Sequence, residues 1–571
     1  MMDESAFRGI HFSVTDHLDP KHLRRAPHKP DAMIRYILDR LGWLTALYAT
    51  ITYGVYSTRN LIPERISLAL CLVLTLLYVK KAGFHLGQER RIRALGKHAP
   101  SVRTPYPFNL GVMFQALYYF SQHRNHEFWW KLFKNGNPNR PYTVEAVTLG
   151  GRLVFTVDEE NIKAILATQF SDYGKGPQFR KEWKDFLGLS IFTTDKELWH
   201  NSRQLLRPQF IKDRVSDLQK FEHHVQILLP MLAGSHNGAT VRLDDFMYRF
   251  TLDAATDFLF GTSVGSLQNG EAEFAQAFAE VQGVQAIIAR SGPLASLYPK
   301  KKFHEALDVM NKFTDRYIDQ ALQLPKEELE KKTKSDEGYT FLHAIATYTR
   351  DRQVLRDQLV AVLLAGRDTT AVTLSWLFYE LSLKPEIVKK LRQEIISYVG
   401  LQREPTYDDL KSMRYLQHTL NETLRLYPVV PYNVRVALED TTLPHGGGPD
   451  GMEPVGIAKD TPIGYSTFVM QRRADIYPPE SEKFPHYLTF APERWDHWTP
   501  KSWTHIPFNG GPRICIGQQF ALTELAYTVT RILQTFERVE CRMDEFPGTK
   551  TDIVLQPAKG VYVAFVKAES V

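Results

Sequence analysis

Ten residues near the C-terminal end of the chain, FNGGPRICIG (508–517), constrain its fold more than any other segment. Gly510 and Gly511 permit a tight turn and the close approach of a flat group, and a helical pattern starts at Gly517. The first amides of that helix are expected to point toward the Cys515 sulfur, where they and the helix dipole favour the thiolate. The segment therefore predicts a thiolate ligand held on a glycine loop.

Composition limits what else the chain can be. Its 571 residues contain three cysteines, so neither a disulfide framework nor a four-thiolate metal site can form, and a reducing compartment is expected. Cys71 lies in an apolar run and Cys541 in RVECRM, which favours structural roles for both. The net charge of +6 is small for this length and gives no support to nucleic-acid binding. We expect one large domain behind an N-terminal appendage.

The appendage has the pattern of a membrane anchor. Residues 41–57 carry no charge, and residues 66–79 are more apolar but shorter than the roughly 20 residues that span a bilayer comfortably. Basic residues flank the pair on both outer sides and are few in the loop between, which favours a hairpin with both ends in the cytosol. One span with an interfacial helix stays open. The predicted boundaries are 1–40 for a cytosolic basic segment, 41–80 for the anchor, 81–108 for a basic, proline-containing hinge and 109–571 for the large domain.

The large domain is expected to be mainly α-helical with a minor β-sheet, an α+β fold. Residues 142–157 alternate around a Gly-Gly pair and predict a β-hairpin. The longest helical pattern covers 354–383 and ends before Pro385, and others cover 413–427 and 517–537.

Two short motifs suggest a hydrolase, but their surroundings argue against one. GTSVG (261–265) fits a nucleophile elbow and HGGG (445–448) fits an oxyanion loop. The elbow needs a strand before its serine, whereas the preceding residues have helical spacing, and the oxyanion motif lies on the wrong side of the serine. Gly261 is therefore interpreted as a helix C-cap. His123 and His126 could share a helix face, but without a third ligand nearby a solvated pair is expected.

The Cys515 segment suggests a particular ligand. A thiolate on a glycine-flanked loop beneath a planar group is typical of an axial ligand to haem iron, and Arg513 is placed to reach a haem propionate. Phe508, Gly511, Arg513, Cys515 and Gly517 complete the pattern F-x-x-G-x-R-x-C-x-G. With this pattern the sequence resembles the cytochrome P450 superfamily of haem-thiolate monooxygenases. The resemblance implies a triangular, helix-rich domain.

Further motifs occur in the order that this family has. NETLRLYP supplies Glu422 and Arg425 on one helical face, and FAPERW supplies Arg494, which the resemblance implies is their partner in a structural triad. LWHNSR and VVPYNVR match two further family motifs. Four residues are thereby implied to converge on the edge of the haem: Trp199, Arg203, Arg435 and Arg513.

The segment LLAGRDTTA (363–371) lies inside the longest predicted helix. Gly366 costs about 1 kcal/mol relative to alanine there, and Thr369 can bond back to a carbonyl, so we expect a local distortion that could admit dioxygen. Oxygen activation needs protons, and an acid beside an alcohol, Asp368 and Thr369, can relay them through water. With Thr370, which completes the motif, these residues form the predicted catalytic set.

Three segments look most like the fungal branch of the family that hydroxylates alkanes and fatty acids: 182–210, 365–370 and 508–524. The resemblance predicts hydroxylation at or next to the terminal carbon of an n-alkane or fatty acid. Leu189 stands where related sequences often have an acidic residue, which leaves the exact substrate open. The same chemistry on xenobiotic aromatic or terpenoid compounds is the first alternative.

The resemblance also implies cofactors and partners. Haem b is the cofactor, with Cys515 as the metal ligand, and electrons come from NADPH through a membrane-bound reductase, with cytochrome b5 open as a second donor. Dioxygen, an apolar substrate and the lipid bilayer are the other partners, and the endoplasmic reticulum membrane is the expected location, with the large domain on the cytosolic side. A basic surface on the thiolate side would attract an acidic reductase, and five residues are expected to form it: Arg203, Arg207, Lys212, Arg214 and, from the cysteine loop, Arg513.

Two other function classes stay open. A haem-thiolate isomerase or dehydratase would share the Cys515 loop but would not need Asp368 and Thr369. A non-enzymatic membrane haem sensor or carrier would need neither an apolar pocket nor an electron supply.

Overall fold

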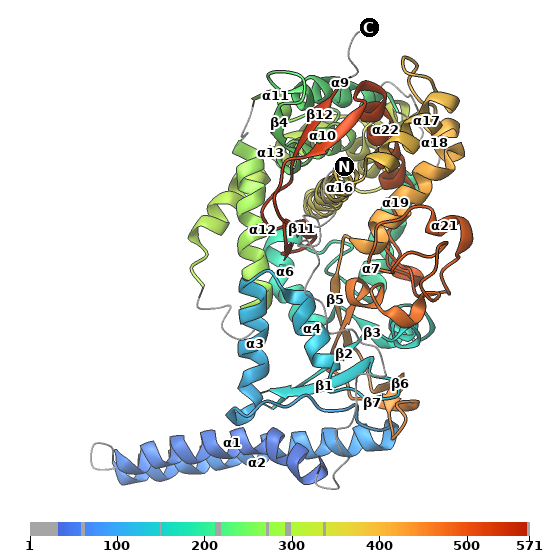
Figure 1. The fold of residues 1–571 in the computed structure, drawn as a ribbon. Coiled ribbons are helices and arrows are strands. Elements are labelled where there is room, and N and C mark those ends of the chain that lie inside the picture. Colours follow the sequence, from blue (N-terminus) through green and yellow to red (C-terminus); the bar gives the residue numbers. More distant parts are fainter. Residues whose placement is uncertain are drawn as a thin grey trace.

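The computed structural model describes residues 32–58, 63–148, 150–211, 218–269, 273–291, 298–334 and 339–567 (Figure 1). Helices dominate these residues and four small sheets accompany them, which confirms the expected mainly helical fold with a minor sheet. Most of the predicted basic segment 1–40 lies outside the described residues, as do Lys212 and Arg214.

Twenty-one α-helices occur in the described residues: α1 (Ala32–Ser57), α2 (Glu64–Leu95), α3 (Leu110–Ser121), α4 (Asn125–Phe133), α5 (Glu159–Lys163), α6 (Gly176–Leu187), α7 (Lys196–Leu206), α9 (Gln219–Ala233), α10 (Leu243–Phe260), α11 (Ser266–Asn269), α12 (Glu273–Ser291), α13 (Lys301–Gln323), α14 (Lys326–Lys334), α15 (Phe341–Ala346), α16 (Arg352–Ser382), α17 (Pro385–Tyr398), α18 (Tyr407–Ser412), α19 (Arg414–Leu426), α20 (Thr467–Met470), α21 (Arg494–His497) and α22 (Gln518–Thr535).

The largest sheet has the strand order β1-β2-β8-β5-β3, with β2 and β8 parallel and the other neighbours antiparallel. Its strands are β1 (Thr143–Thr148), β2 (Gly151–Thr156), β3 (Tyr173–Gly174), β5 (Tyr432–Ala437) and β8 (Pro462–Ser466). The three smaller sheets pair β4 (Thr240–Arg242), β12 (Tyr562–Val566) and β9 (Arg538–Cys541); β6 (Thr441–Gly447) and β7 (Glu453–Ile457); and β10 (Thr549–Thr551) and β11 (Leu555–Pro557). β1 and β2 form the predicted hairpin.

Helix α16 runs through the helical part of the molecule (Figure 1). Its N-terminus is capped by the Asp351 carboxylate, which accepts hydrogen bonds from two backbone amides of the first turn, and it ends before Pro385. Most of its side chains are buried, so it packs on every face, against α10, α13, α19 and α22. Trp376 illustrates this packing: its ring stacks on Tyr427 with centroids 4.2 Å apart, and its indole N–H donates to the Leu555 carbonyl at 2.7 Å.

The two N-terminal helices lie side by side at the foot of Figure 1, next to the β1–β2 hairpin. Among the described residues, one helix, at 65–95, is long and apolar enough to cross a membrane. α1 begins at Ala32, ahead of the uncharged segment 41–57, and α2 continues to Leu95, so residues 81–95 of the predicted hinge are helical. The reason is composition: the basic stretch is rich in Leu, Ala, Gln, Glu, Lys and Arg, which are good helix formers.

The structure also bears on the hydrolase motifs. Residues before Ser263 form α10, and Gly261 follows it in the left-handed conformation, with its N–H bonded to the Asp257 carbonyl at 2.8 Å. Gly261 is therefore the C-cap that its position predicted. Because a helix precedes Ser263, the strand that a nucleophile elbow requires is not there.

Candidate active site

The loop that carries Cys515 is held by its own backbone. The Cys515 N–H donates to the Phe508 carbonyl and the Ile514 N–H to the Gly511 carbonyl, both at 3.0 Å. Gly511 has a φ of +65°, and a Cβ there would lie 1.8 Å from the Leu166 carbonyl oxygen. No side chain fits at this position, which explains the second glycine of the pair.

The thiol of Cys515 is free and accessible from a cavity. Burial of the loop raises the pKa of this thiol, while the Gly517 N–H and the nearby Arg203 guanidinium act in the opposite direction. The expected helix-terminus effect therefore has the predicted sign, but burial outweighs it. A cationic ligand at the sulfur would be needed to hold the thiolate.

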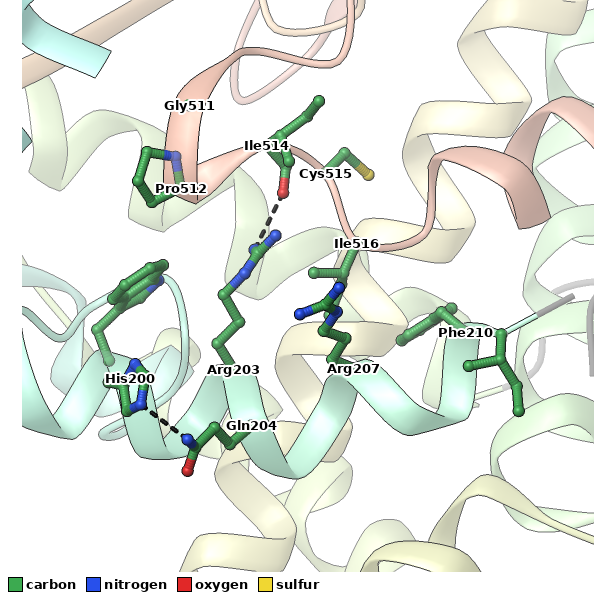
Figure 2. A pocket seen from close by; sticks show the side chains of 12 residues that line it. His200, Arg203, Gln204, Arg207, Phe210, Gly511, Pro512, Ile514, Cys515 and Ile516 are labelled. Atoms are coloured by element: carbon green, nitrogen blue, oxygen red, sulfur yellow. Dashed lines mark hydrogen bonds between the residues drawn. The ribbon is translucent and has the colours of Figure 1, made fainter. Parts of the chain in front are cut away.

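The cavity beside Cys515 has a volume of about 750 Å³ and lies between α7 and the cysteine loop (Figure 2). Arg203 crosses it, donating from Nη1 to the Ile514 carbonyl at 3.0 Å, so that α7 is tied to the loop. Twelve residues line the cavity: Trp199, His200, Arg203, Gln204, Arg207, Phe210, Ile211, Gly511, Pro512, Ile514, Cys515 and Ile516.

Three basic residues, Lys175, Arg435 and Arg513, lie close together next to this loop, and the carboxylate of Asp195 lies beside two of them. Arg513 Nη2 donates to Asp195 Oδ1 at 2.7 Å, and the backbone amides of Lys175 and Gly176 donate to the same carboxylate at 2.8 Å. Burial, then Arg435 and Arg513, hold the pKa of Lys175 well below its usual range. Burial and then Arg435 likewise lower the pKa of Arg513 to about 10. The cluster therefore carries more positive charge than its own carboxylate neutralises.

The other predicted haem-edge residues lie in the same region. The Arg513 guanidinium lies over the Trp199 ring, 4.7 Å from its centroid, and Arg203 lies 5.8 Å from the same centroid. Arg435 is buried and donates to neighbours on its own strand, to Asn433 Oδ1 at 2.8 Å and the Val434 carbonyl at 3.0 Å. The Nε of Arg513 is buried with no hydrogen-bond partner in the structure described.

The predicted structural triad is assembled and fully buried. Arg425 makes a bidentate pair with Glu422, at 2.7 Å and 2.8 Å, and Arg494 Nε lies 3.5 Å from Glu422 Oε1. Trp495, which sequence reasoning missed, donates its indole N–H to Glu422 Oε2 at 3.1 Å. Both arginines also donate to the Thr489 carbonyl, so the triad fixes the segment that leads to the cysteine loop.

The acid and the alcohol of α16 are held by different groups. Asp368 accepts from Arg367 Nη1 at 3.0 Å and from Gln282 Nε2 of α12 at 2.5 Å. Burial raises the pKa of the Asp368 carboxyl, and Arg367 opposes the rise. Thr369 Oγ1 donates to the Ala365 carbonyl at 2.6 Å, the back-bond that its position predicted.

The remaining two residues of the predicted catalytic set behave differently. Thr370 points into the protein and donates to Glu524 Oε2 of α22 at 3.0 Å. At Gly366 the helix is continuous, so the expected local distortion does not interrupt α16. A Cβ at Gly366 would meet Ala255 at 3.7 Å, an ordinary contact, so packing alone does not require glycine there.

Comparison with known proteins identifies the family. The cytochrome P450 family model matches residues 103–565. The chain belongs to the cytochrome P450 family. It is 49% identical over 530 residues to cytochrome P450 monooxygenase pvhE of Talaromyces variabilis, which covers 89% of this chain and 98% of that protein. It is 39% identical to cytochrome P450 52A12 of Debaryomyces hansenii (82% of this chain, 92% of the relative) and 43% identical to cytochrome P450 52A1 of Candida tropicalis (69% and 74%).

As a cytochrome P450, the chain is a haem-dependent monooxygenase whose electrons come from a reductase, which confirms the predicted enzyme class and cofactor. Residues around Cys515 fit that cofactor. The surplus of positive charge at Lys175, Arg435 and Arg513 matches a dianionic group, and the unpartnered Arg513 Nε leaves a donor for it. No cluster of three metal-ligating side chains occurs in the part of the chain that is described, so a lone thiolate is the ligand set that Cys515 offers.

Sequence reasoning missed three polar residues of this P450 site: Lys175, Gln282 and Glu524. Lys175 sits in YGKGPQF, where no cysteine-loop or helix motif marks it, and Gln282 lies on an ordinary amphipathic helix. Glu524 ends the segment 508–524 that resembles the fungal branch, but only the fold shows that this carboxyl is buried. A carboxylate at an otherwise apolar position of α22 was the one available signal.

Proposed function

We propose that this cytochrome P450 hydroxylates linear alkanes or fatty acids at or next to the terminal carbon. The observation that carries the proposal is apolar surface beside Arg435. The side chains of Val430 and Val434 are 40% and 47% exposed, although the residue that follows each of them, Pro431 and Arg435, is buried. The resemblance of three segments to the alkane- and fatty-acid-hydroxylating branch supports the same substrate class.

An apolar surface of this kind selects a chain by length. Each buried methylene contributes about 0.8 kcal/mol, so a chain of about 12 to 18 carbons could bind tightly without a specific polar contact. Terminal C–H bonds are the strongest in such a chain, so strength cannot direct the reaction there. The site must instead confine the end of the chain near the reacting position.

The residues around the cysteine loop hold the cofactor in this proposal. Cys515 would supply the thiolate that binds the haem iron, and Phe508, Gly511 and Gly517 shape its loop. Five residues would hold the acidic edge of the haem: Trp199, Lys175, Arg203, Arg435 and Arg513. Haem bound in this way supplies the activation of dioxygen, and the protein supplies orientation, exclusion of water and protons.

The protons are proposed to pass from Asp368 to Thr369 through water. The raised pKa of Asp368 lets this carboxyl hold a proton at a higher pH than an ordinary aspartate. The Thr369 hydroxyl donates its hydrogen bond to the Ala365 carbonyl, so its oxygen is free to accept a hydrogen bond from a water molecule. Gln282 and Arg367 fix the carboxyl on the side of α12.

The two N-terminal helices support a proposal for where the protein is located and for its electron donor. We propose that α1 and α2 anchor the chain in the endoplasmic reticulum membrane with the large domain in the cytosol. An NADPH-dependent reductase in the same membrane is then the electron donor. The bilayer also concentrates apolar substrates near the domain.

The test measures spectral binding and products for the full-length chain in lipid vesicles with NADPH and a reductase, over a series of linear alkanes and fatty acids. Affinity should rise with each added carbon up to a limit, and the product should carry its hydroxyl at or next to the chain end. Val434→Phe should move the limit to shorter chains, whereas Ile396→Phe on α17, where the side chain is similarly exposed, should leave it unchanged. Turnover of bulky polycyclic compounds with none of any linear chain would contradict the proposal.

A further inference from the structure

Glu524 is a buried carboxyl group without a cationic partner. It lies on α22, is 3% exposed, and has one hydrogen bond among the described residues, from Thr370 Oγ1 at 3.0 Å. Several other buried carboxylates have a cationic partner, as Glu422 has in Arg425, Glu145 in Arg152 and Glu380 in Lys384. A charged carboxylate at position 524 would therefore be uncompensated, which is costly in a protein interior.

Burial raises the pKa of Glu524 to about 8, and the Thr370 hydrogen bond opposes the rise only in part. On the elements that pack against α22, several ionisable side chains are engaged with other groups: Arg367 pairs with Asp368, Glu380 with Lys384, Glu422 with Arg425 and Glu222 with Arg531, while Arg392 donates to the Phe536 carbonyl and Lys411 to Gln519. Glu524 is therefore an uncharged carboxylic acid near neutral pH.

A second polar group accompanies it. Thr528 lies one turn further along α22, on the same helical face as Glu524, and its hydroxyl is fully buried with no hydrogen-bond partner among the described residues. Buried hydroxyls and carboxyls almost always have partners, and an ordered water molecule is the usual one where the protein offers none. Glu524 and Thr528 thus form a polar strip on one face of α22, and the hydrogen bond from Thr370 joins this strip to α16.

We propose that Glu524 is a buried acid that supplies protons from the α22 side to the Asp368–Thr369 pair, through Thr370 and water held near Thr528. The inference rests on the proton relay of the proposed function. In the transfer the O–H bond of the acid breaks and a new O–H bond forms on a water molecule at Thr370, which passes one of its protons on to the Asp368–Thr369 pair. The Glu524 carboxylate regains a proton from bulk solvent through water on the Thr528 side. No electrons change hands.

The sign of the pH dependence follows. Below pH 8 the acid is protonated and can donate. As pH rises through about 8 it loses its proton, and the supply fails. The share of electrons lost as peroxide should therefore increase over that range in the natural protein. Glu524→Gln, which cannot release a proton, should have a high peroxide share at every pH and no inflection near 8.

The decisive measurement uses the full-length, haem-loaded protein without substrate. Infrared difference spectra over a pH titration should contain the C=O band of a protonated carboxylic acid, disappearing with a midpoint near 8 and shifting on glutamate isotope labelling. Glu524→Gln should lack the band, and Glu380→Gln, which removes a buried carboxylate paired with Lys384, should keep it. A band that persists in Glu524→Gln, or that titrates in the ordinary carboxyl range, overturns the inference.

Peroxide measurements separate this inference from the proposed relay. We expect Glu524→Gln and Thr369→Ala each to raise the ratio of peroxide to hydroxylated product several-fold, with substrate binding unchanged. If only Thr369→Ala does so, the relay survives and the role of Glu524 is wrong. If neither does, the relay itself is wrong. Should Glu524→Gln fail to fold, Thr370→Val removes the same connection and must show the same peroxide share.

Discussion

Cys515 differs from the other two cysteines in what surrounds it. Its loop is fixed by backbone hydrogen bonds and by a glycine that no other residue can replace, whereas Cys71 lies within α2 and Cys541 ends β9. Cys515→Ser removes the soft ligand and leaves the loop intact. The variant should keep the helical signal in circular dichroism and lose the carbon monoxide band after which the family is named.

Cys541→Ser is the matched control for that experiment. It removes a cysteine outside the site and should keep the carbon monoxide band at full height. Survival of the band in Cys515→Ser, or its loss in Cys541→Ser, would contradict the assignment of the ligand.

Residues marked by a local motif could be predicted from the sequence. Cys515, Arg513 and the Glu422–Arg425 pair stand in fixed spacings that carry their chemistry with them. Lys175 and Glu524 could not be predicted, because what distinguishes them is their surroundings in the folded chain: Lys175 is buried near Arg435 and Arg513, and Glu524 is buried with Thr370 as its partner. Those surroundings arise only when the segment before α6 meets β5 and when α22 packs against α16.

At the scale of elements, α1 and α2 are joined by polar contacts in an otherwise apolar seam. Tyr48 OH lies 2.8 Å from Thr75 Oγ1, Thr45 Oγ1 lies 3.0 Å from Tyr78 OH, and the two tyrosine rings are 4.9 Å apart. In lipid such groups need partners, and here each helix supplies them to the other. These contacts hold α1 and α2 together as the proposed hairpin requires, while among the described residues one helix, at 65–95, is long and apolar enough to cross a membrane.

A glycosylation acceptor inserted between Ser57 and Glu64 tests this arrangement. If the helices form a hairpin with cytosolic ends, the inserted site lies in the lumen and should be glycosylated. An acceptor inserted at residues 98–103 should stay unmodified, because it lies on the domain side of the membrane. An unmodified site at the hairpin tip would instead support the interfacial arrangement of α1.

Element types followed from periodicity, but some boundaries did not. The β1–β2 hairpin, α16, α19 and α22 all lie within two residues of the predicted ends, since turns, prolines and caps mark them. The extension of α2 to Leu95 was missed because charge, which signals the end of a membrane segment, does not end a helix. The helix stops at Gly96.

At the scale of the whole molecule, the anchor is attached firmly to the catalytic domain. The backbone of Lys97 pairs with β7, and His98 bridges Glu89 of α2 and Glu145 of β1 at 3.0 Å each. Burial lowers the pKa of His98, but the two carboxylates outweigh it and raise the pKa to about 9, so the bridge is charged at neutral pH. This junction fixes the position of the large domain, with its Cys515 loop, relative to α2.

We expect electrons to enter at the basic surface formed by Arg203 of α7 and Arg207, which directly follows α7. Arg207 is exposed and lines the cavity beside Cys515, together with Arg203 (Figure 2). A cationic face attracts an acidic partner at long range, and salt screens this attraction.

Arg207→Glu should therefore slow the first electron transfer from the reductase roughly tenfold at low salt, as stopped-flow reduction would measure. The deficit in rate should shrink as ionic strength rises. Lys301→Glu on α13 makes the same charge change outside the cavity and should leave the rate unchanged. A deficit that is the same at every salt concentration would point to a damaged fold, and equal deficits in the two variants would mean that net charge, and not this face, sets the rate.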